Sequence, residues 1–112
     1  MSAATYDLVI DQGSDFSIDL TVTEDGSAKN LSVYSARAQM RSTKTASSVA
    51  GSFTCSIVNA SAGTLKMELS NSTSSAMTAG RYFYDLEVFT SGNAIVKRLI
   101  EGTVTLNQEV TR

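Results

Sequence analysis

The stretch from Gly80 to Leu106 constrains the fold more than any other part of the chain. Its first half alternates two sets of side chains, with Tyr82, Tyr84, Leu86 and Val88 in one set and Phe83, Asp85, Glu87 and Phe89 in the other. A period of two is typical of a β-strand whose two faces meet different surroundings. A tight turn, Ser91-Gly92-Asn93, then leads into a second apolar run. The stretch therefore predicts a hairpin of two long strands.

The pairing of this hairpin predicts where its side chains lie. A register that places Glu87 opposite Lys97 brings two opposite charges together across the strands. The same register places Arg98 opposite the inward Leu86, which favours a β-bulge near Arg98 or a position at a mouth of the sheet. It also gathers four large apolar residues on the outer face, namely Phe83, Phe89, Ile95 and Leu99. Such a cluster indicates either an interface or a surface covered by the chain's own loop 42–51 or a terminus.

Shorter alternating runs precede the hairpin. They cover 5–10, 16–23, 34–41, 53–57 and 65–69, and turn residues such as Gly, Asn and Asp separate them. Residues 70–77 are the one segment with a local helical pattern, and we expect a single turn there that crosses between sheets. About seven strands with no long helix predict an all-β fold, an antiparallel two-sheet β-sandwich. We expect one domain over 1–112, with residues 1–4 as a loose N-terminus.

The composition argues against catalysis. The chain has no histidine, which removes the usual general base and the histidine-containing metal sites. Its single cysteine, Cys55, lies in an alternating run and is predicted to be a buried apolar residue. Asp85 and Glu87 could be read as a hydrolase pair, but they stand on one outward strand face where solvation explains them better. We therefore predict no enzyme activity, no cofactor and no metal site.

Charge limits the partners and suggests where they dock. The net charge is −2 and the pI is about 4.9, so neither nucleic acid nor an anionic membrane is expected to be a partner. Residues 1–25 carry six acids and no base, whereas 29–44 carry four bases and no acid. These are either solvated faces or complementary patches that set the register between copies or partners. On the second interpretation the charged candidates are Asp15, Asp19, Arg37 and Arg41.

The segment 78–84 resembles the corner that begins the sixth strand of immunoglobulin-like (Ig-like) domains. A turn of small residues leads into a strand with alternate tyrosines, and Tyr82 takes the place of the corner tyrosine. The chain lacks the cysteine pair and the core tryptophan of antibody domains, so the resemblance is to the broad Ig-like class. It implies an Ig-like β-sandwich.

A second resemblance covers nearly the whole chain. Segments 6–16, 31–41, 79–87 and 98–105 resemble, in order, those of small tail proteins of contractile-tailed bacteriophages, including cyanophage-like examples. Val33 departs from that pattern, in which glycine is frequent. The resemblance implies a virion structural protein of the tail or baseplate, assembled in the host cytoplasm. Its expected partners are other virion proteins, and a homo-oligomer in the particle is a further possibility. The apolar face and the charged candidates would then be its interface.

A carbohydrate- or cell-surface-binding module is the alternative. Such a module would bind through loops at one end of the sandwich, and exposed aromatic residues on loops would favour it. The tyrosines and phenylalanines of this chain lie instead within predicted strands. A third interpretation is an Ig-like scaffold with no independent role.

Overall fold

The computed structural model describes residues 4–24 and 26–111, and strands dominate it. The strands found there are β1 (Ala4–Thr5), β2 (Leu8–Asp11), β3 (Phe16–Thr21), β4 (Thr23–Glu24), β5 (Ser27–Ala28), β6 (Ser35–Arg41), β7 (Gly51–Asn59), β8 (Thr64–Leu69), β9 (Gly80–Phe89) and β10 (Val96–Asn107). A short helix, α1 (Asn71–Ala76), lies between β8 and β9, and a 3-10 turn, η1 (Ser91–Asn93), joins β9 to β10. The predicted all-β class is confirmed.

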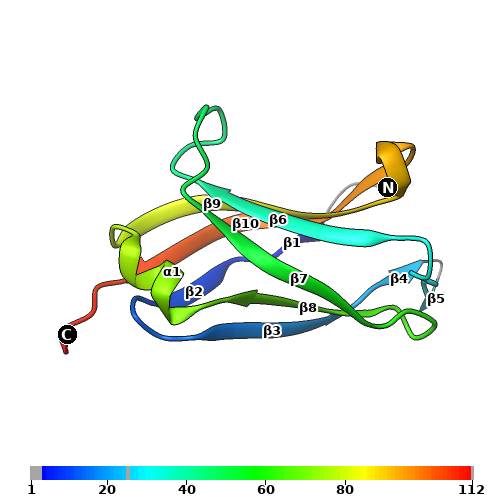
Figure 1. Ribbon diagram of the computed structural model, residues 1–112, viewed down its shortest axis with the longest axis horizontal. Coiled ribbons are helices and arrows are strands. Elements are labelled where there is room, and N and C mark those ends of the chain that lie inside the picture. Colours follow the sequence, from blue (N-terminus) through cyan, green and yellow to red (C-terminus); the bar gives the residue numbers. More distant parts are fainter. Residues whose placement is uncertain (1–3, 25, 112) are drawn as a thin grey trace.

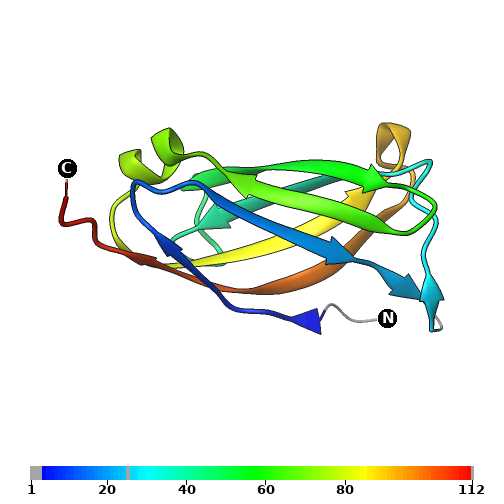
Figure 2. The same cartoon turned by 90° about the horizontal axis from the view of Figure 1, so that it is seen from below.

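Eight of these strands form one curled sheet. Their order is β1-β10-β9-β6-β7-β8-β3, and β2 also pairs with β10. The sheet folds over on itself as a half-barrel, so that two layers face each other (Figures 1 and 2). A small second sheet contains β4 and β5. The expected pair of separate sheets is therefore corrected to two layers joined in one sheet.

Strand β7 makes the connection between the layers. Its first residues pair with β6, and from Thr54 onward it pairs with β8. The strand begins at Gly51, a residue that the sequence placed in a loop. A Cβ atom on Gly51 would lie 2.9 Å from the sulfur of Met77 and 3.1 Å from the terminal carbon of Met40. Glycine thus allows β7 to run close over two core methionines and to join both layers.

The core fills the space between the two layers. Alternate residues of the long strands are buried there, together with Leu31 from the segment before β6. The largest fully buried apolar residues are Ile10, Leu31, Met40, Leu65, Met67, Leu69, Leu86, Val88 and Val104. The ring of Phe53 lies between those of Phe16 and Tyr84, with centroid separations of 6.2 and 6.1 Å. The inward faces predicted from alternation are confirmed for β6, β8 and β9.

The β9–β10 hairpin forms, but its register differs from the expected one. Glu87 pairs with Arg98 rather than Lys97, and Leu86 pairs with Ile100. The register shifts between Arg98 and Ile100, which confirms the predicted bulge. Because of the shift, Arg98 is exposed while Leu99 and Ile100 both pack against the core.

The corner between the layers is built around α1 and Tyr82. The Ser70 hydroxyl accepts a hydrogen bond from the Thr73 amide and caps the helix. Tyr82 is buried, and its hydroxyl donates a hydrogen bond to the Thr78 carbonyl. The predicted single helical turn and the contact expected of a corner tyrosine are both present.

The N-terminal edge of the sheet is held by side chains as well as by pairing. β1 and β2 run parallel to β10, and Ala4 pairs with Ile100, so the expectation of a loose end at Ala4 is wrong. Residues 1–3 lie outside the described residues. Tyr6 and Asp7 lie between β1 and β2. The Tyr6 carbonyl accepts a hydrogen bond from the Tyr84 hydroxyl at 2.5 Å, and the Asp7 carboxylate accepts one from the Thr103 amide at 2.9 Å.

Candidate docking face

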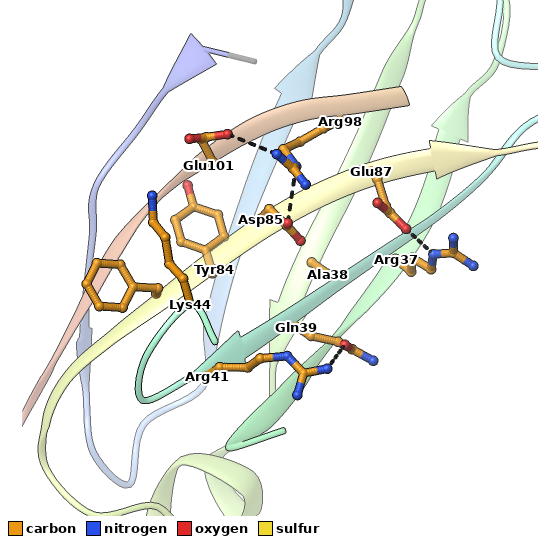
Figure 3. Close-up of a pocket in the computed structure, with 11 residues that line it drawn as sticks. Arg37, Ala38, Gln39, Arg41, Lys44, Tyr84, Asp85, Glu87, Arg98 and Glu101 are labelled. Atoms are coloured by element: carbon orange, nitrogen blue, oxygen red, sulfur yellow. Dashed lines mark hydrogen bonds and ion pairs between the residues drawn. The ribbon is translucent and has the colours of Figure 1, made fainter. Parts of the chain in front are cut away.

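The outer face of β6, β9 and β10 brings together the largest group of candidate residues. In the cross-strand pairing, Arg37 lies opposite Glu87 and Arg41 lies opposite Phe83. This face is hollowed into an open groove of about 530 Å³ (Figure 3). We call it the polar groove, and its charged lining consists of Arg37, Arg41, Lys44, Asp85, Glu87, Arg98 and Glu101.

Ion pairs occupy the middle of the polar groove. The Arg37 Nε lies 2.5 Å from a Glu87 carboxylate oxygen, with the two side chains 40% and 23% exposed. The Arg98 head lies between two carboxylates, 3.2 Å from Asp85 and 3.5 Å from Glu101 (Figure 3). At such exposure an ion pair stabilises the fold by no more than about 1 kcal/mol. These pairs therefore set the pattern of charge on the face more than they stabilise the sheet.

Two of the lining cations lie against aromatic rings of β9. The Arg37 guanidinium lies 4.2 Å from the centroid of the Phe89 ring, which stands beyond the lining of the groove. The Lys44 ammonium lies 5.8 Å from the centroid of the Phe83 ring, which is part of the lining. These distances fall within the range of cation–π attraction. Lys44 belongs to the loop between β6 and β7, so this loop covers part of Phe83.

The four apolar candidates do not form one cluster. Phe83 and Phe89 stand six residues apart on β9, with Asp85 and Glu87 between them on the same face. Ile95 is 48% exposed beside the hairpin turn, and Leu99 packs against the core because of the bulge. The outer face is therefore a charged groove with an aromatic ring near each end, rather than the apolar surface that the sequence predicted.

The acidic and basic candidates lie on different layers. Arg37 and Arg41 line the polar groove, whereas Asp15 and Asp19 belong to the opposite layer. The Asp15 carboxylate accepts hydrogen bonds from the main-chain and side-chain nitrogens of Asn71, at 2.8 and 2.9 Å. Asp19 is exposed and pairs across the strands with Lys66. Asp15 thus has a structural contact of its own at the start of α1.

A second opening of about 670 Å³ lies between β3 on one side and β1 and β10 on the other, where the curled sheet does not close. Its apolar walls include Leu20 and Leu99. Glu24 stands at its rim, 3.1 Å from Lys29 and 3.6 Å from Lys97. The hydrogen bond from Lys29, followed by the charges of both lysines, holds the pKa of Glu24 below its usual value.

Two weakly acidic groups are shifted by burial. Burial raises the pKa of the Cys55 thiol to about 11. It also raises the pKa of Tyr84 to about 12, with smaller contributions from Asp7 and Tyr6. Both groups keep their protons at neutral pH, so Cys55 lacks the thiolate character of a reactive cysteine.

Within residues 4–24 and 26–111, no group of three or more Cys, Asp or Glu side chains is placed to hold a metal ion. In the same residues no helix has the length and apolar character needed to span a membrane.

Sequence reasoning named only Arg37, Arg41 and Phe83 as interface candidates among the residues that line the groove, and it missed Lys44, Gln39 and Arg98 among others. Gln39 stands at the same alternating position as Arg37 and Arg41, which was the available signal. The expected register places Arg98 opposite the inward Leu86 and leaves open either a bulge or a position at a mouth, so it does not predict on which face Arg98 lies. Lys44 reaches the groove from a loop, and no periodic pattern predicts that.

Comparison with known proteins shows similarity at the level of the fold. No family model and no curated protein matches the sequence. The N-terminal domain of phage TP901-1 ORF48 is similar with a TM-score of 0.53 and 15% identity, over 98% of this chain and all of that one. The crystal structure of Listeria monocytogenes InlP is similar with a TM-score of 0.50 and 18% identity, over 94% of this chain. The chain spans 28% of the InlP chain.

Proposed function

We propose that this chain is a non-enzymatic structural component of a bacteriophage virion, in the tail or the baseplate. The observation that carries the proposal is the match to the phage TP901-1 ORF48 domain, which extends over nearly all of this chain and all of that domain. The order of the four segments that resemble phage tail proteins supports the same conclusion independently. Fold similarity alone does not assign a role, so the proposal depends on both observations together.

We further propose that the curled sheet is an Ig-like sandwich. The pairing of β3 with β8, of β6 with β9 and of β9 with β10 matches two facing antiparallel layers. The hydrogen bond from Tyr82 to the Thr78 carbonyl supports the same description, because a tyrosine at this corner is typical of Ig-like domains. The continuous strand β7 is then a local link between the layers.

The polar groove is the surface that we propose for docking to other virion proteins. Half-buried aromatic rings near its two ends offer apolar area, and the ion pairs between them offer a fixed pattern of charge. Patterned charge selects partners and sets their orientation more than it adds affinity. The partners would be other tail or baseplate proteins, or further copies of this chain, met during assembly in the host cytoplasm.

The groove favours protein docking over the alternative of sugar binding. Sugar rings bind proteins by stacking on open aromatic faces, whereas Phe83 and Phe89 each have a cation against the ring. A glycan array with the purified protein tests the alternative directly. Specific binding to a glycan would revive it.

Quantitative mass spectrometry of purified particles tests the proposed role. We expect the chain in the particle, at a copy number that is a multiple of three or six if it belongs to the baseplate. Host proteins carried along with the particles give the background level. An amount of the chain no higher than that background would refute the structural role.

A blocking variant tests the groove as the docking surface. Gln39→Trp places a bulky side chain in the groove, where Gln39 is exposed. Ser56→Trp, at an exposed position of β7 on the other layer, is the matched control. We expect Gln39→Trp to fold normally but to enter particles poorly, and Ser56→Trp to enter them like the unchanged chain. Equal entry of both variants would refute this docking surface.

A further inference from the structure

One end of the polar groove carries positive charge that the chain does not neutralise. The groove is lined by four cations and three carboxylates, and all three carboxylates are engaged by Arg37 or Arg98. The other two cations are Arg41 and Lys44. In the described part of the chain, neither has a carboxylate within 4.0 Å. Two positive charges therefore remain uncompensated at this end, on a chain whose net charge is −2.

Arg41 is held in place by neutral acceptors. One terminal nitrogen donates to the Ala46 carbonyl at 3.1 Å. The other donates to the Gln39 side-chain oxygen at 3.3 Å (Figure 3). A guanidinium has five N–H donors, so these two contacts leave three for a ligand. The head is thus oriented by the fold while its charge and most of its donors remain available.

Phe83 is a neighbour of both cations. It is the cross-strand partner of Arg41, and the Lys44 ammonium lies 5.8 Å from the centroid of its ring. Lys44 makes no hydrogen bond to another described residue, so its three donors add to those of Arg41. In Figure 3 the two charged heads point in different directions, with Arg41 beside Gln39, so they offer positive charge at two separate places of this end of the groove.

We infer that this end of the groove binds the carboxylate of an aspartate or glutamate on an extended segment of a partner protein. The planar fork of Arg41 matches the two oxygens of a carboxylate, and Lys44 supplies a second charge from the loop. The stem of an acidic side chain held by Lys44 would pack against Phe83. The groove's own carboxylates form ion pairs with Arg37 and Arg98, so they do not compete for the site. The inference rests on the proposed function only for the identity of the partner as a virion protein.

Peptide titration of the purified protein tests the chemistry without a particle. The probes are acetyl-Gly-Ser-Glu-Val-Glu-Gly-amide and the same peptide with both glutamates replaced by glutamine. We expect the acidic peptide to shift the NMR signals of Arg41, Lys44 and Phe83, and the neutral peptide to leave them unchanged. Equal shifts with both peptides would overturn the inference. Tighter binding of a ten-residue oligothymidylate would also overturn it, in favour of a phosphate site.

Variants separate this site from general charge effects. Lys44→Gln removes an exposed charge and should weaken binding of the acidic peptide about tenfold, since charge-assisted bonds are lost. Arg41→Gln should weaken it at least as much, and unchanged Phe53 signals would show that the core is intact. The matched control is Lys66→Gln, on the opposite layer, which should bind like the unchanged protein. Equal weakening by the Lys66 variant would mean nonspecific attraction and would overturn the inference.

Crosslinking in particles distinguishes this inference from the proposed function. A carbodiimide joins a lysine amine directly to a carboxylate and takes up the water that is lost. We expect Lys44 to become joined to an aspartate or glutamate of another polypeptide, and Lys66 to show no such product. A chain that is present in particles but lacks the Lys44 product would overturn this inference and leave the virion role intact. Absence of the chain from particles would refute the virion role, and the peptide titration would then decide the inference alone.

Discussion

Removing the Tyr84 hydroxyl tests whether its hydrogen bond holds the N-terminal edge to the sheet. Tyr84 is 4% exposed, and its hydroxyl donates at 2.5 Å to the Tyr6 carbonyl between β1 and β2. Tyr84→Phe removes this one bond and keeps the ring, which still contacts Phe53. A hydrogen bond of this kind contributes about 1 kcal/mol net to the free energy of unfolding. For a domain of this size that loss lowers the melting temperature by about 5 °C.

Hydrogen exchange shows which strands are destabilised by the loss of the Tyr84 hydrogen bond. We expect Tyr84→Phe to speed the exchange of amides in β1 and β2, because these short strands lose a side-chain contact to β9. The matched control is Tyr82→Phe, which removes the hydroxyl that donates to the Thr78 carbonyl. That variant should lose similar stability in urea titrations but exchange faster at the corner of α1.

The two variants together can refute the reasoning. If Tyr84→Phe left the exchange of 4–11 unchanged, the hydroxyl would not be what holds the N-terminal edge. The same conclusion would follow if both variants sped exchange at the same amides, because the effect would then be global.

Three further predictions concern single positions. The free energy of unfolding should fall as pH rises from about 9 to 11. The reason is that the Cys55 thiol has an ordinary pKa of 9.0 in the unfolded chain and so loses its proton there before it does in the fold. In urea titrations over this pH range, Cys55→Val should remove the part of the fall that is due to this thiol. Asp15→Ala should lower the free energy of unfolding by about 1 kcal/mol through loss of its bonds to Asn71, whereas Asp19→Ala should change it little in thermal melts. Gly102→Ala should lower the free energy of unfolding by about 1–3 kcal/mol, since its Cβ would overlap the main-chain oxygen of Tyr6, and a normal urea midpoint would contradict this.

Alternation in the sequence was sufficient to predict the class of fold and the inward faces of the long strands. It was not sufficient to predict the outer face of the hairpin. Side chains alternate with a period of two, so a single extra residue at Leu99 exchanges the faces of everything between it and the turn. The sequence indicated a bulge near Arg98 but did not indicate on which side of it each residue falls. The apolar surface expected there became a charged groove for this reason.

The distribution of charge along the sequence was also a weak guide. The acids near the N-terminus were interpreted as a solvated face or a patch for partners. In the structure Asp7 and Asp15 accept hydrogen bonds from main-chain amides of Thr103 and Asn71, residues far away in the sequence. No local pattern reveals such contacts, because the partner amide is set by the tertiary fold. Asp19, by contrast, is exposed as expected.

The parallel pairing of β2 with β10 has a mechanical consequence. The two strands pair from Leu8 with Val104 to Asp11 with Asn107, and the chain enters and leaves this ladder at opposite ends (Figure 2). A force that pulls the two ends of the chain apart therefore slides one strand along the other. Hydrogen bonds loaded in this way share the force and must break together, unlike those of a hairpin, which open one after another. The fold is thus arranged to resist stretching along its longest axis.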